Sequence, residues 1–401
     1  MVNFVIVIDS NVNRRTLFIK TIKQYISPIQ GLNVNTCSNG ALSSIWTSGS
    51  WTPINHLNDK EGTATIWGDA IKQCGSQRIS AKQLRLLWNN IFTKMPVSFD
   101  GFHVGFVYDH AKGLIVGADL LGLFPVFYYT SNDVLLVGSS PELFKFHTCF
   151  KTELNPLGLV GIFLTNGLVD GQTLLKGVKR LNAGHLLTWK FGEDPKELEQ
   201  YQIPISTKYF DLSFSEQLNL LNRALNRAVV RHAPKGYRYC LSLSGGLDSR
   251  IIGGYLKQNA IETVALTMGS ITDIEMRCAR KVSSTLGFNQ YKATVDFEKY
   301  LSCADRKVMW EHLSNGFSGL GTWSLSLNLR KLAPRVITGY LGDSILGAWL
   351  NNDSFEKNFE ESNEWGFSPE ILKKLLKHEV FDDFILDILA RLKRNIFDIR
   401  N

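Results

Sequence analysis

The segment 239–250 constrains the fold of this chain more than any other stretch. An apolar run ends at Leu243 and meets Ser244-Gly245-Gly246, and a second apolar run, residues 251–256, follows at helical spacing. This order predicts a buried strand, a tight glycine turn and the start of a helix. Such a turn aims backbone N–H groups and a helix N-terminus at one small volume, which suits a phosphate group.

The side chains of this turn extend the prediction. Gly245 and Gly246 let the backbone approach an anion closely, and Ser244 and Ser249 offer hydroxyl donors. Asp248 would repel a phosphate unless a cation lay between them, and Mg²⁺ is commonly held by carboxylate and phosphate oxygens. The residues alone leave one alternative open, a glycine-rich connection in which Asp248 or Ser249 only caps the helix.

The pattern Ser-Gly-Gly-Leu-Asp-Ser resembles the pyrophosphate loop of enzymes that cleave ATP to AMP and pyrophosphate. It differs from the P-loop pattern G-x-x-x-x-G-K-S/T because no Lys follows the glycines. The resemblance predicts ATP and Mg²⁺ as ligands of this segment.

Bulk properties set the class of protein. A chain of 401 residues is long enough for two domains, and its formal charge of +7 is mild. A nucleotide or another anionic substrate accounts for that charge as well as a nucleic acid does, and we expect neither nucleic acid nor a membrane as partner. The cysteines form no C-x-x-C pair, and residues 1–9 read as a strand and not as a signal peptide, so we expect a cytoplasmic protein.

Periodicity predicts further elements in both halves. In the N-terminal half we expect helices over 14–25 and 81–91, followed by hairpins from strands at 102–108, 114–119, 125–129 and 134–138. In the C-terminal half we expect a helix over 217–230 and a parallel strand over 261–268. Thr272 and Glu275 have the spacing of a capping box that opens a helix running to Leu286 and ending at Gly287.

Five stretches together resemble the asparagine synthetase family. Residues 100–102, 119–129 and 138–143 are similar to its glutamine amidotransferase half, residues 173–185 to the link between its halves, and residues 244–249 to its nucleotide loop. The similarity covers roughly residues 100–350. It implies α/β combined with α+β: an N-terminal αββα amidotransferase-like sandwich over 1–205, and a C-terminal doubly wound parallel-sheet ATP-pyrophosphatase domain over 206–401 that is C-terminally short.

One departure concerns the amidotransferase half. In the family, glutamine is hydrolysed by a Cys that becomes the first residue, and its free amine serves as base to its own thiol. This chain has Val2, and its first Cys is Cys37 in a stretch that looks like a loop. We therefore expect the fold without glutaminase chemistry, as in the family members without this Cys, β-lactam synthetase and the lasso-peptide cyclases. His103 and His185 are interpreted as structural.

A second segment of the C-terminal half, residues 335–347, is similar to the family's second nucleotide segment. The resemblance makes Gly339 the glycine that approaches the nucleotide and Asp343 a Mg²⁺ ligand beside Asp248. Met268 stands where the family has a residue against the adenine. The plain alternatives are a helix cap for Asp343 and a core position for Met268.

Two positions depart from the family pattern in this segment. Tyr340 stands where the family has a Glu in its catalytic loop, and Ser344 replaces another Glu. A Tyr still donates a hydrogen bond, so Tyr340 is the candidate catalytic residue. No Lys beyond this segment matches the one that the family uses as pyrophosphate leaves.

Taken together, these features predict a ligase that activates a carboxylate as an acyl-adenylate and joins it to an amine. The carboxylate is a small molecule or a peptide, and neither the donor of the amine nor the oligomeric state is fixed by the sequence. The rival interpretation is a catalytically degenerate relative that binds a nucleotide or a partner without turnover. A third is a fragment of a longer enzyme.

Overall fold

The computed structural model of the chain describes residues 3–73, 75–88, 97–165, 167–201, 207–311, 320–326, 329–340, 342, 369–376, 383–388 and 390. The chain divides into two compact units. The first unit holds the described residues of Met1–Ile203, Asp305–Ser318 and Asn363–Asn401, and the second holds those of Pro204–Ala304 and Gly319–Ser362.

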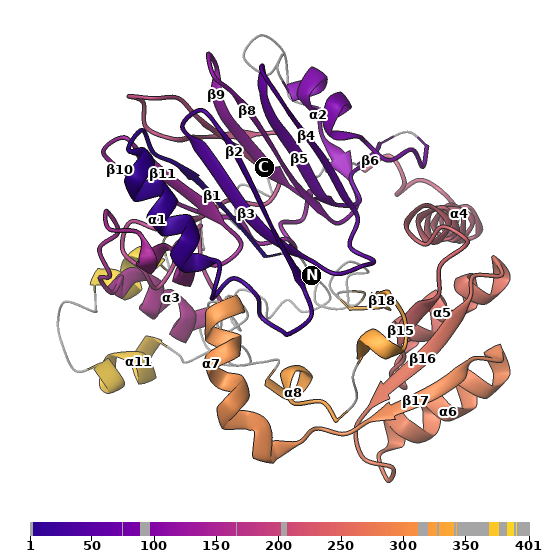
Figure 1. Cartoon of the computed structure of the whole chain (residues 1–401). Helices are drawn as coiled ribbons and strands as arrows, with labels where there is room; N and C mark the ends of the chain where they lie inside the picture. The colour runs from indigo at the N-terminus through magenta and orange to yellow at the C-terminus, as the bar shows by residue number, and fades with distance from the viewer. Residues whose placement is uncertain are drawn as a thin grey trace. The chain divides into compact units, whose positions relative to one another are not determined.

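Two six-stranded antiparallel sheets form the centre of the first unit (Figure 1). One sheet has the order β12-β10-β11-β1-β3-β2, with strands Lys179–Arg180, Phe127–Ser131, Val134–Gly138, Phe4–Ile8, Leu42–Ser48 and Asn33–Asn39. The other has the order β14-β13-β9-β8-β5-β4, with strands Lys196–Glu199, His185–Trp189, Gly113–Ala118, His103–Asp109, Gly62–Gly68 and Ile54–Asp59. Two short strands, β6 (Ile71–Lys72) and β7 (Phe99–Asp100), pair with each other in a separate two-stranded sheet.

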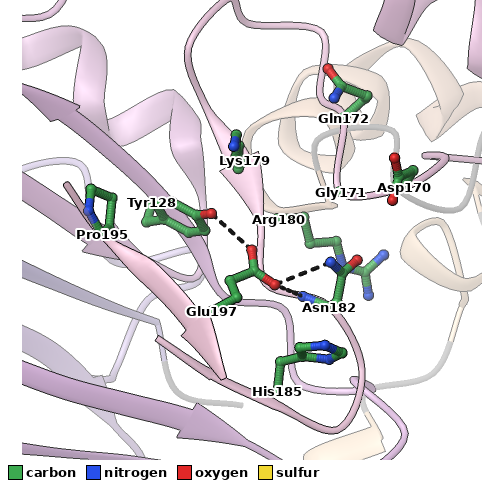
Figure 2. A pocket seen from close by; sticks show the side chains of 10 residues that line it. All are labelled: Tyr128, Asp170, Gly171, Gln172, Lys179, Arg180, Asn182, His185, Pro195 and Glu197. Carbon is green, nitrogen blue, oxygen red and sulfur yellow. Dashed lines mark hydrogen bonds between the residues drawn. The ribbon is translucent and has the colours of Figure 1, made fainter. Parts of the chain in front are cut away.

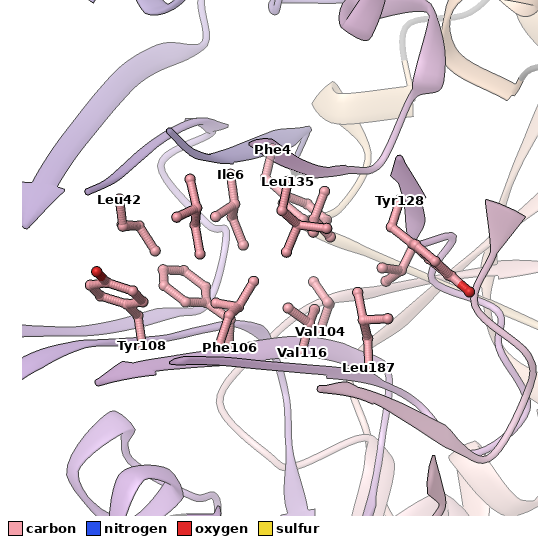
Figure 3. Close-up of a cluster of buried hydrophobic side chains, with 14 of the residues drawn as sticks. Phe4, Ile6, Leu42, Val104, Phe106, Tyr108, Val116, Tyr128, Leu135 and Leu187 are labelled. Carbon is pink, nitrogen blue, oxygen red and sulfur yellow. The ribbon is translucent and has the colours of Figure 1, made fainter. Parts of the chain in front are cut away.

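The main core of the first unit lies between the two sheets. Side chains from one sheet, such as Phe4, Ile6 and Leu135, face side chains from the other, such as Val104 and Leu187 (Figure 3). All five of these side chains are fully buried. Side chains alternate between the two faces along each strand, which places every second side chain in the core between the sheets.

Helices cover the outer faces of the two sheets. Helix α1 (Val12–Ile22) packs on β3 with Phe18 and Ile22 buried, and α2 (Ala81–Trp88) packs on β4, β5 and β8. Both faces of the sheet that contains β1 are therefore covered. This explains why the sequence of β1, Phe-Val-Ile-Val-Ile, is apolar without interruption. The layer order is the predicted αββα.

The remaining described helices of the first unit are short. They are η1 (Pro141–Phe146), α3 (Pro156–Thr165) and α11 (Pro369–Leu376). Helices α3 and α11 share a small apolar cluster that includes Val160 and Leu372. Helix α7 (Tyr300–Glu311) crosses the boundary between the two units.

The second unit is built on a four-stranded sheet in which all described pairs are parallel. Its strands are β15 (Tyr239–Ser242), β16 (Thr263–Met268), β17 (Asn289–Ala293) and β18 (Arg335–Thr338). The spatial order is β17-β16-β15-β18. The chain thus moves outward from β15 to β17 and then returns to the opposite side of β15.

Helices and short turns cover both faces of this sheet. One face packs against α4 (Phe214–His232), α5 (Leu247–Gln258) and α6 (Ile274–Leu286) through residues such as Val229, Leu256 and Ala279. The other face, with Cys240 and Leu266, is covered by Leu332 and Ala333, close to the turn η3 (Leu329–Lys331). The short segments η2 (Phe297–Lys299) and α8 (Leu320–Trp323) complete the described elements. The predicted doubly wound α/β fold is confirmed.

Three local predictions were wrong. Helix α6 begins at Ile274 after the N-cap Asp273, so Thr272 stands one position before the cap. Its hydroxyl lies 2.9 Å from Ser270 Oγ, and no Thr272–Glu275 capping box forms. Cys37 lies in strand β2 and is buried in the apolar core, although its neighbours in the sequence are polar. Helix α1 is shifted toward the N-terminus of its predicted range and ends at Ile22.

Some of the predicted residues lie outside the described ranges, and other predictions are confirmed. Asp343, Ser344 and Val2 are outside the described residues. The C-cap of α6 is Gly287 in the left-handed region, as predicted. Among the described helices, none is long and apolar enough to cross a membrane.

Candidate functional site

The candidate site lies where the order of the parallel strands reverses. Strand β15 is paired with β16 on one side and with β18 on the other, so the direction in which the chain adds strands reverses beside β15. In open α/β sheets the crevice at such a switch point is the usual place for ligands. The predicted loop 244–249 follows β15, and the predicted segment 335–347 begins with β18.

Hydrogen bonds within the loop give it a fixed shape. The hydroxyl oxygens of Ser244 and Ser249 are 3.0 Å apart, and the Gly246 N–H donates to Ser244 Oγ at 3.1 Å. The Ser249 hydroxyl also lies 3.3 Å from the carbonyl oxygen of Ser244, which can only accept. Ser249 is buried, so its hydroxyl braces the loop from within, whereas Ser244 stands nearer the surface.

Gly245 is required by close packing against helix α6. A β-carbon at this position would lie 3.0 Å from Glu275 Cα and 3.0 Å from Cys278 Cβ. The absence of a side chain therefore lets the first turn of α6 press against the loop. Glu275 has this packing role in the structure.

The N-terminus of α5 follows the loop directly. Its N-cap is Gly246, which has no side chain to accept from the first-turn N–H groups. Asp248 lies in the first turn and Ser249 within the helix, so the alternative in which either of them caps the helix is wrong. The uncapped N–H groups and the helix dipole make this terminus favourable for an anion.

The turn after β18 lies against Asp248. A β-carbon on Gly339 would stand 2.8 Å from the Ser249 nitrogen and 2.9 Å from Asp248 Cβ. A β-carbon on Gly342 would stand 2.5 Å from Asp248 Cγ, and the Gly342 N–H donates to the Gly339 carbonyl oxygen at 3.2 Å. The two predicted nucleotide segments thus meet at the Asp248 carboxylate, and Asp343 directly follows the residue that touches it.

Tyr340 and Met268 supply exposed side chains at the C-terminal ends of their strands. Tyr340 is 80% exposed, and its backbone N–H donates to Thr338 Oγ1 at 3.1 Å. Met268 is the last residue of β16 and is 40% exposed, so the interpretation as a core methionine is wrong. Gly269, which follows it, has a φ of +128°, and its N–H donates to the Ala293 carbonyl oxygen at 3.0 Å.

Arg250 is a functional candidate that sequence reasoning passed over. Its Nε donates to the Gly246 carbonyl oxygen at 3.1 Å, and the residue is exposed. This contact holds a cation beside the loop that is proposed to receive phosphates. The available signal was its position directly after the Ser-Gly-Gly-Leu-Asp-Ser pattern.

The described residues include only one of the two carboxylates predicted to hold a metal ion. Within the described residues, no group of three or more His, Cys, Asp or Glu side chains could hold a metal ion. Asp248 offers one carboxylate, and Gly342 lies against it. Asp343 follows Gly342 in the sequence. This donor chemistry fits a Mg²⁺ ion that takes its remaining ligands from phosphate oxygens and water.

In the first unit, the chain at the start of β1 contacts both the aromatic side chain of Trp67 and the polar side chains of Thr47 and Ser139. Phe4 stacks on Trp67 with ring centroids 4.6 Å apart. Burial raises the pKa of the Cys37 thiol, against a smaller opposite effect of its hydrogen bond with Thr63. A neutral buried thiol is a poor nucleophile. His103 is buried in strand β8, whereas His185 lines a cleft described below.

Comparisons with known proteins match both units. Residues 220–385 match the family model of asparagine synthase, and residues 86–202 match that of the glutamine amidotransferase domain. A Methanocaldococcus jannaschii protein named "Putative asparagine synthetase (glutamine-hydrolyzing) 2" is 23% identical over 282 residues, 66% of this chain and 53% of that protein. The chain thus spans about half the length of this curated relative.

Solved structures give weaker similarity. The Bacillus subtilis glutamine phosphoribosylpyrophosphate amidotransferase with ADP and GMP is 9% identical, at a TM-score of 0.30, over 74% of this chain and 67% of its own. The ammonia-dependent NAD synthetase of Campylobacter jejuni is 16% identical, at a TM-score of 0.20, over 46% of this chain and 96% of its own. Both scores are low, so the fold assignment rests on the sheet topology. Taken together, the two family models and the curated relative support membership of the asparagine synthetase family.

Proposed function

We propose that this protein is an ATP-dependent amide-bond synthetase that activates a carboxylate as an acyl-adenylate and releases pyrophosphate. An amine then attacks the activated carbonyl carbon, forms the amide and displaces AMP. The observation that carries the proposal is the meeting of the two loops at Asp248, at the switch point of the parallel sheet. Family membership supports the same kind of reaction.

The loop after β15 would bind the phosphates of ATP. The uncapped N–H groups at the start of α5 and the Ser244 hydroxyl are donors that suit the departing pyrophosphate. Gly245 and Gly246 keep the loop free of side chains, and Ser249 holds its shape. Arg250 would add positive charge from the side of the helix.

Asp248 and Asp343 would hold Mg²⁺, which would offset the negative charge of the triphosphate. Gly339 lets the turn after β18 approach the nucleotide site, and exposed Met268 offers an apolar surface for the adenine ring. The chain's own contribution is to place the α-phosphate and the carboxylate in line and to stabilise charge there.

Tyr340 is the proposed catalytic residue. Its exposed side chain belongs to the same turn as Gly339 and Gly342, which contact Asp248. A phenol is neutral near pH 7, so it would donate a hydrogen bond to the reacting groups instead of removing a proton as a carboxylate would.

The amine would not come from glutamine hydrolysed by this chain. The support is the Val at position 2 and the burial of Cys37 inside strand β2. The M. jannaschii relative is named as glutamine-hydrolyzing, which is a statement about that protein. Free ammonia, or an amine of the substrate itself, would serve instead.

A degenerate, nucleotide-binding relative is the second candidate. Tyr340 favours it, because the residue replaces a carboxylate of the family's catalytic loop. Such a protein would bind MgATP, or a partner, without chemistry.

Calorimetric titration with MgATP tests the shared site first. The native chain should bind, and Asp248→Ala should bind at least about tenfold more weakly, which corresponds to about 1.4 kcal/mol. Asp343→Ala tests the second carboxylate, and Asp211→Ala, at an exposed turn before α4, is the matched control. Equal binding by native chain and Asp248→Ala would contradict the site.

Pyrophosphate release then separates the two candidates. The native chain is incubated with MgATP, ammonium and a panel of amino acids and dicarboxylates. Release that depends on one carboxylate and is lost in Asp248→Ala supports the synthetase. Binding of MgATP without release across the panel supports the degenerate relative.

A further inference from the structure

A polar cleft in the first unit shares no residue with the nucleotide site. Its volume is about 360 Å³, which is within the size range of small-molecule sites. Its walls come from β10, β12, the 170–172 turn, the start of β13 and strand β14 (Figure 2). Strand β12 is held in place on two sides, by pairing with β10 and by a hydrogen bond from the Arg180 N–H to the Gly171 carbonyl oxygen at 2.8 Å.

The acidic groups of the cleft already have partners. Glu197 accepts from the Tyr128 hydroxyl at 2.8 Å, and from the backbone and side-chain nitrogens of Asn182 at 3.3 and 3.1 Å (Figure 2). Three donors thus offset the charge of this carboxylate. Asp170 is exposed at a turn with a φ of +50° and also has a partner.

The basic groups of the cleft retain unused donors. Arg180 is half-buried and donates from Nη2 to the Gly122 carbonyl oxygen at 2.9 Å, while its Nε and Nη1 have no partner among the described residues. Desolvation lowers the pKa of its guanidinium, against the opposite effect of Asp119, but an arginine remains charged near neutral pH. Lys179 precedes it on β12 and is exposed, with no ion-pair partner among the described residues.

His185 adds a further polar atom. Its Nδ1 lies 2.9 Å from the Ala183 carbonyl oxygen, which can only accept, so Nδ1 carries the proton. Nε2 is then available to a ligand, as an acceptor in the neutral ring or as a donor in the charged ring.

From this imbalance we propose that the cleft binds a small molecule that carries a phosphate group. The formal charges of the lining cancel, but the carboxylates have partners, whereas the Lys179 ammonium and the Nε and Nη1 atoms of Arg180 have none among the described residues, so the available electrostatic interactions favour an anion. A guanidinium fork beside an ammonium group suits the several oxygens of a phosphate. The rest of the volume, lined by Tyr128 and Gln172, would hold the organic part of the ligand.

Phosphorus NMR titration of the 401-residue chain with inorganic phosphate, and then with glycerol 3-phosphate, tests the proposal. Lys179→Ala and Arg180→Gln should each weaken the cleft binding at least about tenfold. Lys176→Ala is the matched control, because Lys176 lies three positions before Lys179 and pairs with Glu153 at 2.9 Å. Thermal melting without ligand verifies that each variant is folded, and Lys179→Ala leaves the Gly122 contact of Arg180 intact.

The nucleotide loop could also bind phosphate, so a second arm separates the two sites. The double variant Ser244→Ala with Asp248→Ala should retain the binding that Lys179→Ala removes. Binding that is equal in native chain, Lys179→Ala and Arg180→Gln would overturn the proposal. Binding of acetate in the cleft with none of phosphate would overturn it too.

Discussion

Gly342 approaches Asp248 so closely that any side chain at position 342 would occupy the space of the Asp248 carboxyl group. The hypothetical β-carbon would lie 2.5 Å from Cγ and less than 3 Å from both carboxylate oxygens. A β-carbon on Gly339 would likewise lie 2.9 Å from the backbone carbonyl carbon of Asp248. The position of the Asp248 carboxylate therefore depends on a turn that is distant in the sequence.

Gly342→Ala should weaken MgATP binding at least about tenfold, since either the carboxylate or the turn must move. Calorimetry measures the change. Gly254→Ala is the control, because no atom lies within 4 Å of its added methyl group on α5. That control should bind normally and gain about 0.5–1 kcal/mol of unfolding free energy, as an alanine favours a helix. Normal binding by Gly342→Ala would show that the contact is dispensable.

Ser249→Ala should lower the unfolding free energy by about 1 kcal/mol and also weaken MgATP binding, because a buried hydroxyl that braces the loop is lost. Ser244→Ala should affect binding more than stability, since its hydroxyl stands nearer the surface. Urea unfolding and calorimetry on both variants provide the comparison. The reverse order of effects would exchange the two roles.

The stability of the first unit should fall in acid through His103. Burial lowers the pKa of this histidine from 6.5 to about 4, against smaller opposite effects of the Gly101 carbonyl and of Asp100 and Asp69. The folded state thus disfavours protonation of His103. The contribution of the neutral imidazole to the unfolding free energy is therefore complete above pH 6.5 and decreases as the pH falls toward about 4. The whole effect is about 3 kcal/mol.

His103→Gln should remove this part of the pH dependence, whereas His110→Gln, at an exposed turn, should retain it. Urea unfolding at a series of pH values between 7 and 4 gives the slopes. If the native chain and His103→Gln lose the same free energy over that interval, another group is responsible.

Glutamine should not be hydrolysed by the chain. Purified protein incubated with glutamine, with and without MgATP, should release no glutamate above the rate of a buffer blank. Cys37→Ala is the informative variant, because Cys37 is buried in β2 and its thiol has a raised pKa. Glutamate release by the native chain that is lost in Cys37→Ala would assign the thiol a catalytic role that its burial argues against.

The sequence predicted best where a structural element is defined by its own residues. The strand, turn and helix around Ser244 to Ser249 are encoded within a dozen residues, and the hairpins β8–β9 and β10–β11 have apolar strands on either side of short polar turns. Strand β2 could not be found in this way, because an edge strand with the sequence Asn-Val-Asn-Thr-Cys-Ser-Asn buries only one residue.

Non-local features were harder to predict. The pairing of β18 with β15 depends on the whole sheet, and so does the switch point that brings the Gly342 turn to Asp248. The capping box failed for a local reason, since the helix begins one residue later than predicted and the Thr272 hydroxyl pairs with that of Ser270. The cleft around Arg180 gave no motif, because its lining comes from five separate segments.

The pairing of β18 with β15 also makes the proposed nucleotide site a late product of folding. During synthesis the loop after β15 emerges long before the turn that positions Asp248, so until β18 joins the sheet the loop lacks its closing wall. A nucleotide that requires both parts would bind only chains whose sheet is complete, and its binding energy would stabilise that last strand. Nucleotide affinity would then report whether the second unit has finished folding.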